Sequence, residues 1–167
     1  MFELKTLSKS AIPAALAQAE RYRLLNEPAE AESICLDILR IEPGHQEAII
    51  TMVLALTDEF PEGRHAHAAA EADKAVAGIT DEYKRLYYTG IVKERRGKAV
   101  LRSNRPGSGR SAHEWLREAM TCYERAEAIR PAGNDEAVLR WNTCARLLMS
   151  TPAAEPDVQE FSAIQSE

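Results

Sequence analysis

The sequence predicts an all-α protein. Strand patterns are nearly absent from its 167 residues, whereas apolar residues recur at intervals of three and four over most of the chain, which is typical of amphipathic helices. Proline, glycine and asparagine separate these periodic stretches at short intervals. Because helices joined by such short turns have only their sequence neighbours to bury their apolar stripes against, we expect antiparallel helical hairpins.

Seven helices are expected, each bounded by a break. In chain order they cover about residues 9–25, 28–41, 45–60, 64–78, 81–101, 111–129 and 134–149. The breaks, in the same order, are Asn26 to Pro28, Pro43 with Gly44, Pro61 with Gly63, Asp81, Pro106 to Gly109, and Pro131 with Gly133. Such residues stop one helix or start the next, so each stretch between them is interpreted as one helix.

Composition and charge favour a soluble protein with a single core or one short array. The chain has 21 lysine and arginine residues against 26 aspartate and glutamate residues, with a formal net charge of −5. This balance argues against a protein that coats nucleic acid. No stretch approaches the ~20 apolar residues that a membrane-spanning helix needs, so no membrane span is expected.

Cysteine usage and the N-terminus favour a cytoplasmic protein. Cys35, Cys122 and Cys144 are far apart and lie in helical stretches, so we expect neither a disulfide framework nor a zinc site. The N-terminal apolar run is short, contains Pro13 and continues into an amphipathic helix, which argues against a signal peptide. These features together suit a bacterial, cytoplasmic chain.

Two segments of the chain repeat one pattern. Residues 29–43, AEAESICLDILRIEP, align without a gap with residues 117–131, REAMTCYERAEAIRP. The matched pairs are Ala31 with Ala119, Cys35 with Tyr123, Ile38 with Ala126, and Pro43 with Pro131. The second segment, with its small, aromatic and small residues and closing proline, resembles the second helix of a tetratricopeptide repeat, a helix-turn-helix of about 34 residues.

The resemblance covers about residues 12–149 and implies a right-handed α-α superhelix of about three divergent repeats plus a capping helix. The third repeat begins near Tyr83, with Gly90 and Gly97 at the family's two glycine positions. About 17 extra residues in its hairpin turn form a basic insert at about residues 98–112. Residues 1–149 are thus expected to form one helical domain, followed by a disordered acidic tail at residues 150–167.

The family commonly binds extended peptides or partner helices on a concave face lined by the first helix of each repeat. The resemblance assigns to this groove Leu16, Glu20, Arg23, Leu24, Ile50, Leu54, Thr57, Asp58, Lys84, Tyr87, Ile91, Glu94, Arg95, Val138, Asn142 and Arg146. We expect a non-catalytic adaptor that binds a protein segment carrying an acidic group there. For any single residue, a solvated charge or an intrahelical pair is the competing interpretation. Only Lys84 fits the family's clamp for C-terminal carboxylates, so such a clamp is not expected.

The segment KERRGKAVLRSNRPGSGR, residues 93–110, carries seven cations against one carboxylate in an otherwise acidic chain. Its candidate contact residues are Arg96, Lys98, Arg102, Arg105 and Arg110. The alternative function is therefore a regulatory binder of nucleic acid or another anionic surface, with the loop ordering on contact. No aromatic residue interrupts the basic run to stack on bases, which weakens the nucleic-acid version. A solvated loop that keeps the array soluble is the competing interpretation.

No set of residues predicts catalysis, a cofactor or a metal. His65 and His67 are two positions apart on a helix and point to different sides, with no third ligand evident. Asp58 and Glu59 are adjacent and poorly placed to share a reaction centre, and Cys144 has no histidine on neighbouring turns. We therefore do not expect an enzyme, and association of copies through an exposed array end stays open.

Overall fold

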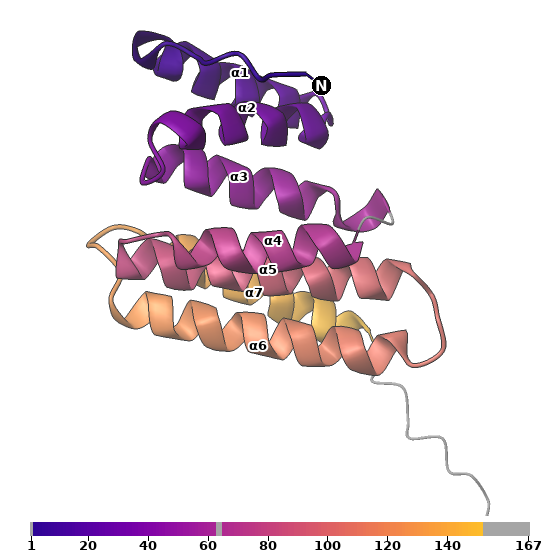
Figure 1. Cartoon of the computed structure of the whole chain (residues 1–167). Coiled ribbons are helices and arrows are strands. Elements are labelled where there is room, and N and C mark those ends of the chain that lie inside the picture. The colour runs from indigo at the N-terminus through magenta and orange to yellow at the C-terminus, as the bar shows by residue number, and fades with distance from the viewer. Residues whose placement is uncertain (1, 63–64, 152–167) are drawn as a thin grey trace, which may run out of the picture.

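The computed structural model of this chain describes residues 2–62 and 65–151 (Figure 1). These residues form seven α-helices and two short 3-10 helices, and they contain no strand. The α-helices are α1 (Ile12–Leu24), α2 (Pro28–Ile41), α3 (Gln46–Asp58), α4 (His65–Ala77), α5 (Glu82–Arg102), α6 (Ser108–Ala128) and α7 (Glu136–Ser150); the 3-10 helices are η1 (Lys9–Ala11) and η2 (Phe60–Glu62). The prediction of an all-α fold is confirmed.

The helices lie where the apolar periodicity predicts them, with differences of a few residues at their ends. Helix α3 ends at Asp58, and the chain continues as η2 because Pro61 lacks the N–H that a longer α-helix needs. Helix α6 begins at Ser108, three residues earlier than expected, directly after Gly107 with φ of 78°. Glycine adopts this left-handed backbone without steric cost, so the turn can be short.

The basic insert is mostly helical, which corrects the expectation of a loop. Helices α5 and α6 each span 21 residues, against 13 for α1 and α3. The extra residues lengthen both helices of one hairpin, and the turn between them is confined to residues 103–107. The added turns bury the small side chains of Ala99 and Ala112. This burial stabilises the extended helices, and the connection is shorter than the one expected over residues 102–110.

The helices pack mostly against their sequence neighbours, in antiparallel pairs (Figure 1). Helix α1 also contacts α3, and α3 also contacts α5, so these three odd-numbered helices adjoin along one side. One core cluster joins α1 through α5 and includes Cys35, Val53 and Leu56. Another joins α5, α6 and α7 and includes Tyr123 and Cys144. Each helix thus buries its apolar stripe on neighbouring helices, as the short turns predict.

Two glycines allow α5 and α6 to approach closely. A Cβ atom at Gly90 would lie 2.4 Å from Cε1 of Tyr123, and one at Gly97 would lie 2.9 Å from Cγ of Leu116. Both facing side chains are buried in the core. Packing therefore explains why the repeat pattern has glycine at these two positions and an aromatic residue on α6. Each glycine leaves the space that a large side chain on α6 fills.

The three cysteines are buried free thiols. Burial raises the pKa of Cys35 and of Cys144 to about 12, so both thiols are neutral at pH 7 and behave as small apolar side chains. Within the described ranges, no helix combines the length and apolarity needed to cross a membrane. Ser150 ends α7, and the rest of the tail predicted to be disordered lies outside the described residues from position 152 onward.

Asp81 begins α5 as its N-cap, because its Oδ1 accepts a hydrogen bond from the backbone N–H of Lys84 at 2.7 Å. Asp81→Ala is expected to lower the free energy of unfolding by about 1 kcal/mol, since the first turn loses this acceptor. Chemical denaturation measures the change. Asp81→Asn keeps an acceptor and is expected to stay within about 0.5 kcal/mol of wild type. Equal losses for the two variants would contradict the capping role.

Candidate functional site

Three residues predicted to line a groove, Arg23, Asp58 and Arg95, meet between α1, α3 and α5. Arg23 Nε donates to Asp58 Oδ2 at 2.9 Å, and Arg95 Nη1 donates to Asp58 Oδ1. The same Arg95 nitrogen donates to Thr57 Oγ1 at 2.7 Å. One carboxylate therefore compensates two guanidinium groups and links three helices that are separate in the sequence.

A second polar cluster surrounds Glu94, whose side chain is fully buried. Tyr123 donates its hydroxyl hydrogen to Glu94 Oε2 at 2.6 Å, while Lys98 Nζ donates to Oε1. Arg140 Nη1 lies 3.4 Å from the same Oε1 atom. Burial, together with the adjacent Glu94 carboxylate, raises the pKa of Tyr123, so its hydroxyl stays protonated and remains a donor. The cluster links α5, α6 and α7 around one satisfied carboxylate.

Part of the predicted groove belongs to the packed interior. Leu16 is 8% exposed and Ile91 is 1% exposed. The prediction that these two side chains line an open groove is therefore wrong. The reason is that adjacent helices close over these positions, which the repeat numbering treats as surface. Leu24, at 88% exposure, is fully solvent-facing instead.

The remaining polar groove residues lie apart from both clusters. Exposed or half-buried members are Glu20, Lys84, Asn142 and Arg146, and none of them lines either of the two cavities described next. Tyr87 is half-buried, with its ring centroid 6.1 Å from that of Tyr83 and 5.1 Å from that of Tyr88. Its ring therefore belongs largely to an aromatic group on α5.

A cavity of about 300 Å³ opens beside the two polar clusters, and we call it the arginine pocket. Its lining residues are Asn26, Thr57, Asp58, Pro61, Glu94, Arg95, Lys98, Arg102 and Arg140. Four of these are cations and two are carboxylates, so positive charge is in excess. Arg95, Lys98 and Arg140 are held in ion pairs. The exposed Arg102 forms no ion pair with any residue that the structure describes.

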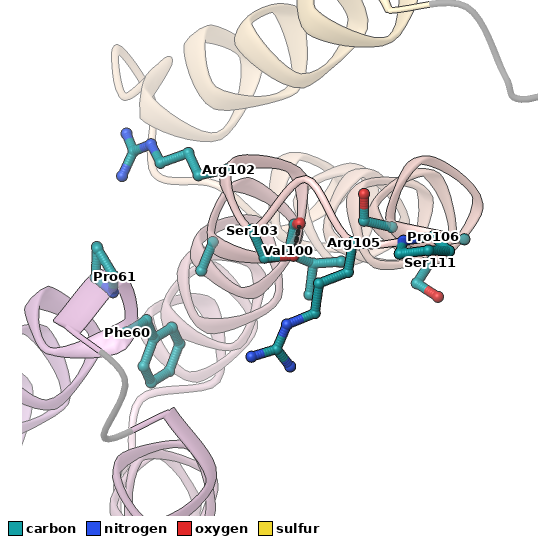
Figure 2. A pocket seen from close by; sticks show the side chains of 11 residues that line it. Phe60, Pro61, Val100, Arg102, Ser103, Arg105, Pro106 and Ser111 are labelled. Carbon is teal, nitrogen blue, oxygen red and sulfur yellow. Dashed lines mark hydrogen bonds between the residues drawn. The ribbon is translucent and has the colours of Figure 1, made fainter.

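A larger cavity of about 650 Å³ lies at the end of the α5–α6 hairpin (Figure 2), and we call it the tip pocket. Its lining residues are Phe60, Pro61, Ala99, Val100, Arg102, Ser103, Arg105, Pro106, Gly107, Ser108 and Ser111. Figure 2 shows Arg105 reaching across the cavity toward η2, while Arg102 points to the other side of α5. Because Pro61 and Arg102 line both cavities, the two pockets adjoin.

Two of the five candidate contact residues in the basic segment, Arg96 and Lys98, have partners within the fold. Arg96 Nη2 donates to the Ala69 carbonyl oxygen at 2.7 Å and to Asp73 Oδ2 at 2.5 Å. Its guanidinium lies 5.0 Å from the centroid of the Trp115 ring, a cation-π distance. Lys98 is bound to buried Glu94, as described above. The charges of Arg96 and Lys98 are therefore largely compensated by the fold itself.

The other three candidate residues of the insert remain open to solvent. Arg102, Arg105 and Arg110 are exposed, and they form no ion pair with any side chain that the structure describes. They sit at the end of α5, in the connecting turn and in the first turn of α6. The hairpin thus concentrates three uncompensated guanidinium groups at one end of the molecule.

The site also contains Arg140, which sequence reasoning did not select. Its partner Glu94 is 46 positions away in the chain, and no local pattern marks such a pair. Among the described residues, no group of three or more histidine, cysteine, aspartate and glutamate residues could hold a metal ion. The side chain of His65 lies outside the described ones. The chemistry available is ion pairing by guanidinium groups beside apolar walls, which suits a ligand that carries carboxylates and apolar groups.

Comparison of the chain with known protein families, with curated proteins and with solved structures finds no match. The comparisons therefore assign no family, and the structure establishes an all-helical protein of seven helices, counted over the described residues, packed in sequence.

Proposed function

We propose that this chain is a divergent tetratricopeptide-repeat array, wound as a right-handed superhelix, that serves as a non-catalytic interaction module in the cytoplasm. The arginine pocket and the tip pocket together bind a segment of a partner protein that combines carboxylates with bulky apolar side chains. The antiparallel helix pairs, the contacts of α3 with both α1 and α5, and the close approach at Gly90 and Gly97 support the array.

The observation that carries the binding proposal is the position of Arg102. This side chain lines both cavities and is exposed, and among the described residues it has no carboxylate partner. A guanidinium group can bind a carboxylate through two parallel hydrogen bonds. The neighbouring cations Arg95 and Arg140 are already fixed by Asp58 and Glu94. A ligand carboxylate therefore meets a positive site whose surroundings need little reordering.

The tip pocket supplies the apolar part of the interaction. Its walls include Pro61, Ala99, Val100 and Pro106. A volume of about 650 Å³ has room for one or two bulky side chains, since pockets for small molecules span about 300–1,000 Å³. A peptide that places a carboxylate at Arg102 can therefore bury an adjacent apolar side chain against the end of α5.

The second candidate function is binding of nucleic acid or another anionic surface through Arg102, Arg105 and Arg110, which are exposed together at the hairpin end. Ionic strength separates the candidates. Binding of a single-stranded oligonucleotide falls steeply with salt concentration, whereas a peptide that also buries apolar groups loses affinity less.

Charge reversal at Arg102 tests the proposed function. The probe is a fluorescein-labelled peptide, Glu-Leu-Glu-Phe-Glu-Leu-Glu, followed by fluorescence anisotropy. Arg102→Glu is expected to raise its Kd at least about 10-fold, because a repulsive charge replaces the cation at the junction of the pockets.

Arg125→Glu is the matched control, with the same change of charge at an exposed residue that lines neither pocket and is not among the residues predicted to line the groove. Its Kd is expected to change less than about twofold, since solvent and salt screen a distant charge. Equal weakening by the two variants would mean that the probe senses only net charge, and the proposed site would then be wrong.

A further inference from the structure

We propose that residues 152–167 of this same chain bind at the tip pocket and compete with the partner segment. The competition rests on the proposed function, whereas the docking does not depend on it. The three observations that support docking are the place where the chain leaves α7, the charge of the segment, and the two kinds of group that the tip pocket offers.

The described chain stops beside the element that bears the tip pocket. The Thr151 carbonyl oxygen accepts a hydrogen bond from His113 Nε2 at 2.9 Å. His113 lies on α6, close in the sequence to Ser108 and Ser111, which line the tip pocket. Figure 1 shows the end of α7 against the N-terminal part of α6, at the end of the molecule where α5 and α6 join. The described chain therefore ends against the same helix, α6, whose first residues line this cavity.

The charge of the following segment complements the hairpin end. Residues 152–167 contain four carboxylates and no lysine, arginine or histidine; the acidic residues are Glu155, Asp157, Glu160 and Glu167. Arg102, Arg105 and Arg110 form no ion pair in the described part of the chain. Deeper in the arginine pocket the cations are already paired. The hairpin end is thus where these carboxylates gain new partners.

The segment also has apolar groups within reach of the tip pocket. Val158 and Phe161 lie among the acidic residues. An extended chain spans roughly 3.3 Å per residue, so Val158 can lie about 23 Å from Thr151. This exceeds the roughly 10–12 Å thickness of a helix, so the chain can pass around α6 to the cavity. The segment can thus place carboxylates near Arg102 and Arg105, and it can place one apolar side chain against Val100. These groups match the cationic part and the apolar part of the tip pocket.

Tethering makes even a weak interaction of this kind effective. A short linker holds a segment at an effective concentration in the millimolar range. A docked segment would cover Arg102, the residue on which the proposed partner binding depends. Partner binding then requires displacement of residues 152–167, which lowers the apparent affinity of the full chain.

The first experiment places the segment directly. A nitroxide spin label is attached to the full chain at Ser162→Cys; the native thiols at Cys35, Cys122 and Cys144 are buried and do not compete for the label. Docking predicts that amide NMR signals of residues 99–108 broaden strongly. A tail-neutral variant, with Glu155→Gln, Asp157→Asn, Glu160→Gln and Glu167→Gln, is expected to recover these signals. The docking is overturned if the signals of residues 99–108 do not broaden, or if they stay broad in the tail-neutral variant. It is also overturned if the strongest broadening occurs at other residues.

The second experiment measures competition without the label. The tail-neutral variant is expected to bind the acidic probe peptide about 2- to 10-fold more tightly than wild type, given a millimolar effective concentration. The matched control neutralises four exposed carboxylates in the N-terminal half, namely Glu3→Gln, Glu27→Gln, Glu30→Gln and Glu47→Gln. Similar tightening in both variants, or none in the first, overturns the competition. A probe that binds no variant refutes the proposed function instead, and the spin label still decides the docking.

Discussion

Glu94→Ala is expected to lower the free energy of unfolding by about 3 kcal/mol, although it removes a charged side chain from the interior. The Tyr123 hydroxyl, fully buried and bonded to Glu94 Oε2 at 2.6 Å, would lose its acceptor, at a cost of about 1–3 kcal/mol. Lys98 and Arg140 would lose their shared counterion, and a cavity would remain between α5, α6 and α7. Urea denaturation of purified variants measures the change.

Two variants serve as controls for this result. Glu94→Gln retains the shape and one acceptor oxygen, so about half of the loss is expected. Glu114→Ala, at an exposed position on α6, is expected to change stability by less than about 0.5 kcal/mol. Tyr123→Phe should cost less in the Glu94→Ala background than in wild type, because the two groups share one hydrogen bond. A Glu94→Ala variant as stable as Glu114→Ala would show that the cluster contributes nothing to the fold.

Gly90→Ala is expected to destabilise the protein by about 2–3 kcal/mol, even though alanine favours a helix over glycine by about 1 kcal/mol. The new methyl group would lie 2.4 Å from Cε1 and 2.8 Å from Cδ1 of Tyr123. The ring cannot move aside easily, because it is fully buried and its hydroxyl is held by Glu94. Either α5 and α6 separate or the ring leaves its site, and thermal denaturation reports both as a lower Tm.

Gly44→Ala is the matched control, since a Cβ atom there meets nothing within 4 Å. It is expected to leave stability within about 0.5 kcal/mol of wild type. Combining Gly90→Ala with Tyr123→Leu should cost less than the sum of the single changes, because the smaller side chain relieves the overlap. If Gly90→Ala has the stability of Gly44→Ala, the close approach of α5 and α6 is not a determinant of the fold.

Local chemistry was enough to predict most of the fold. Proline, glycine and aspartate act on the backbone within one or two residues, so the seven helices could be placed from the sequence to within a few positions. The repeat pattern also singled out Gly90 and Tyr123 separately, whereas their contact is seen only in the structure. The connection between α5 and α6 was predicted to be longer than it is, because Arg102 and residues 108–110 are polar or glycine and show no apolar periodicity that would extend either helix.

The site was only partly visible in the sequence. The repeat numbering placed Arg23, Asp58 and Arg95 on one face, and the structure joins them. The numbering did not distinguish an uncompensated cation such as Arg102 from one that is already paired, such as Arg96, whose carboxylate partner lies 23 positions earlier. The charge available for binding therefore could not be counted from residues 93–110 alone.

What the sequence determines differs from what only the tertiary structure decides, because the interactions involved act over different separations along the chain. Backbone sterics and local periodicity act within a few residues, so the sequence alone determines where helices form and where they end. The positions of the small residues Gly90 and Gly97 are likewise visible in the sequence. Other features depend on which helices become neighbours in space. These are the burial of Glu94, the ion pair of Arg23 with Asp58, and the two cavities that adjoin at Arg102. Ion pairs and cavities act across distances of a few ångströms between segments far apart in the chain, so only the packed structure decides them.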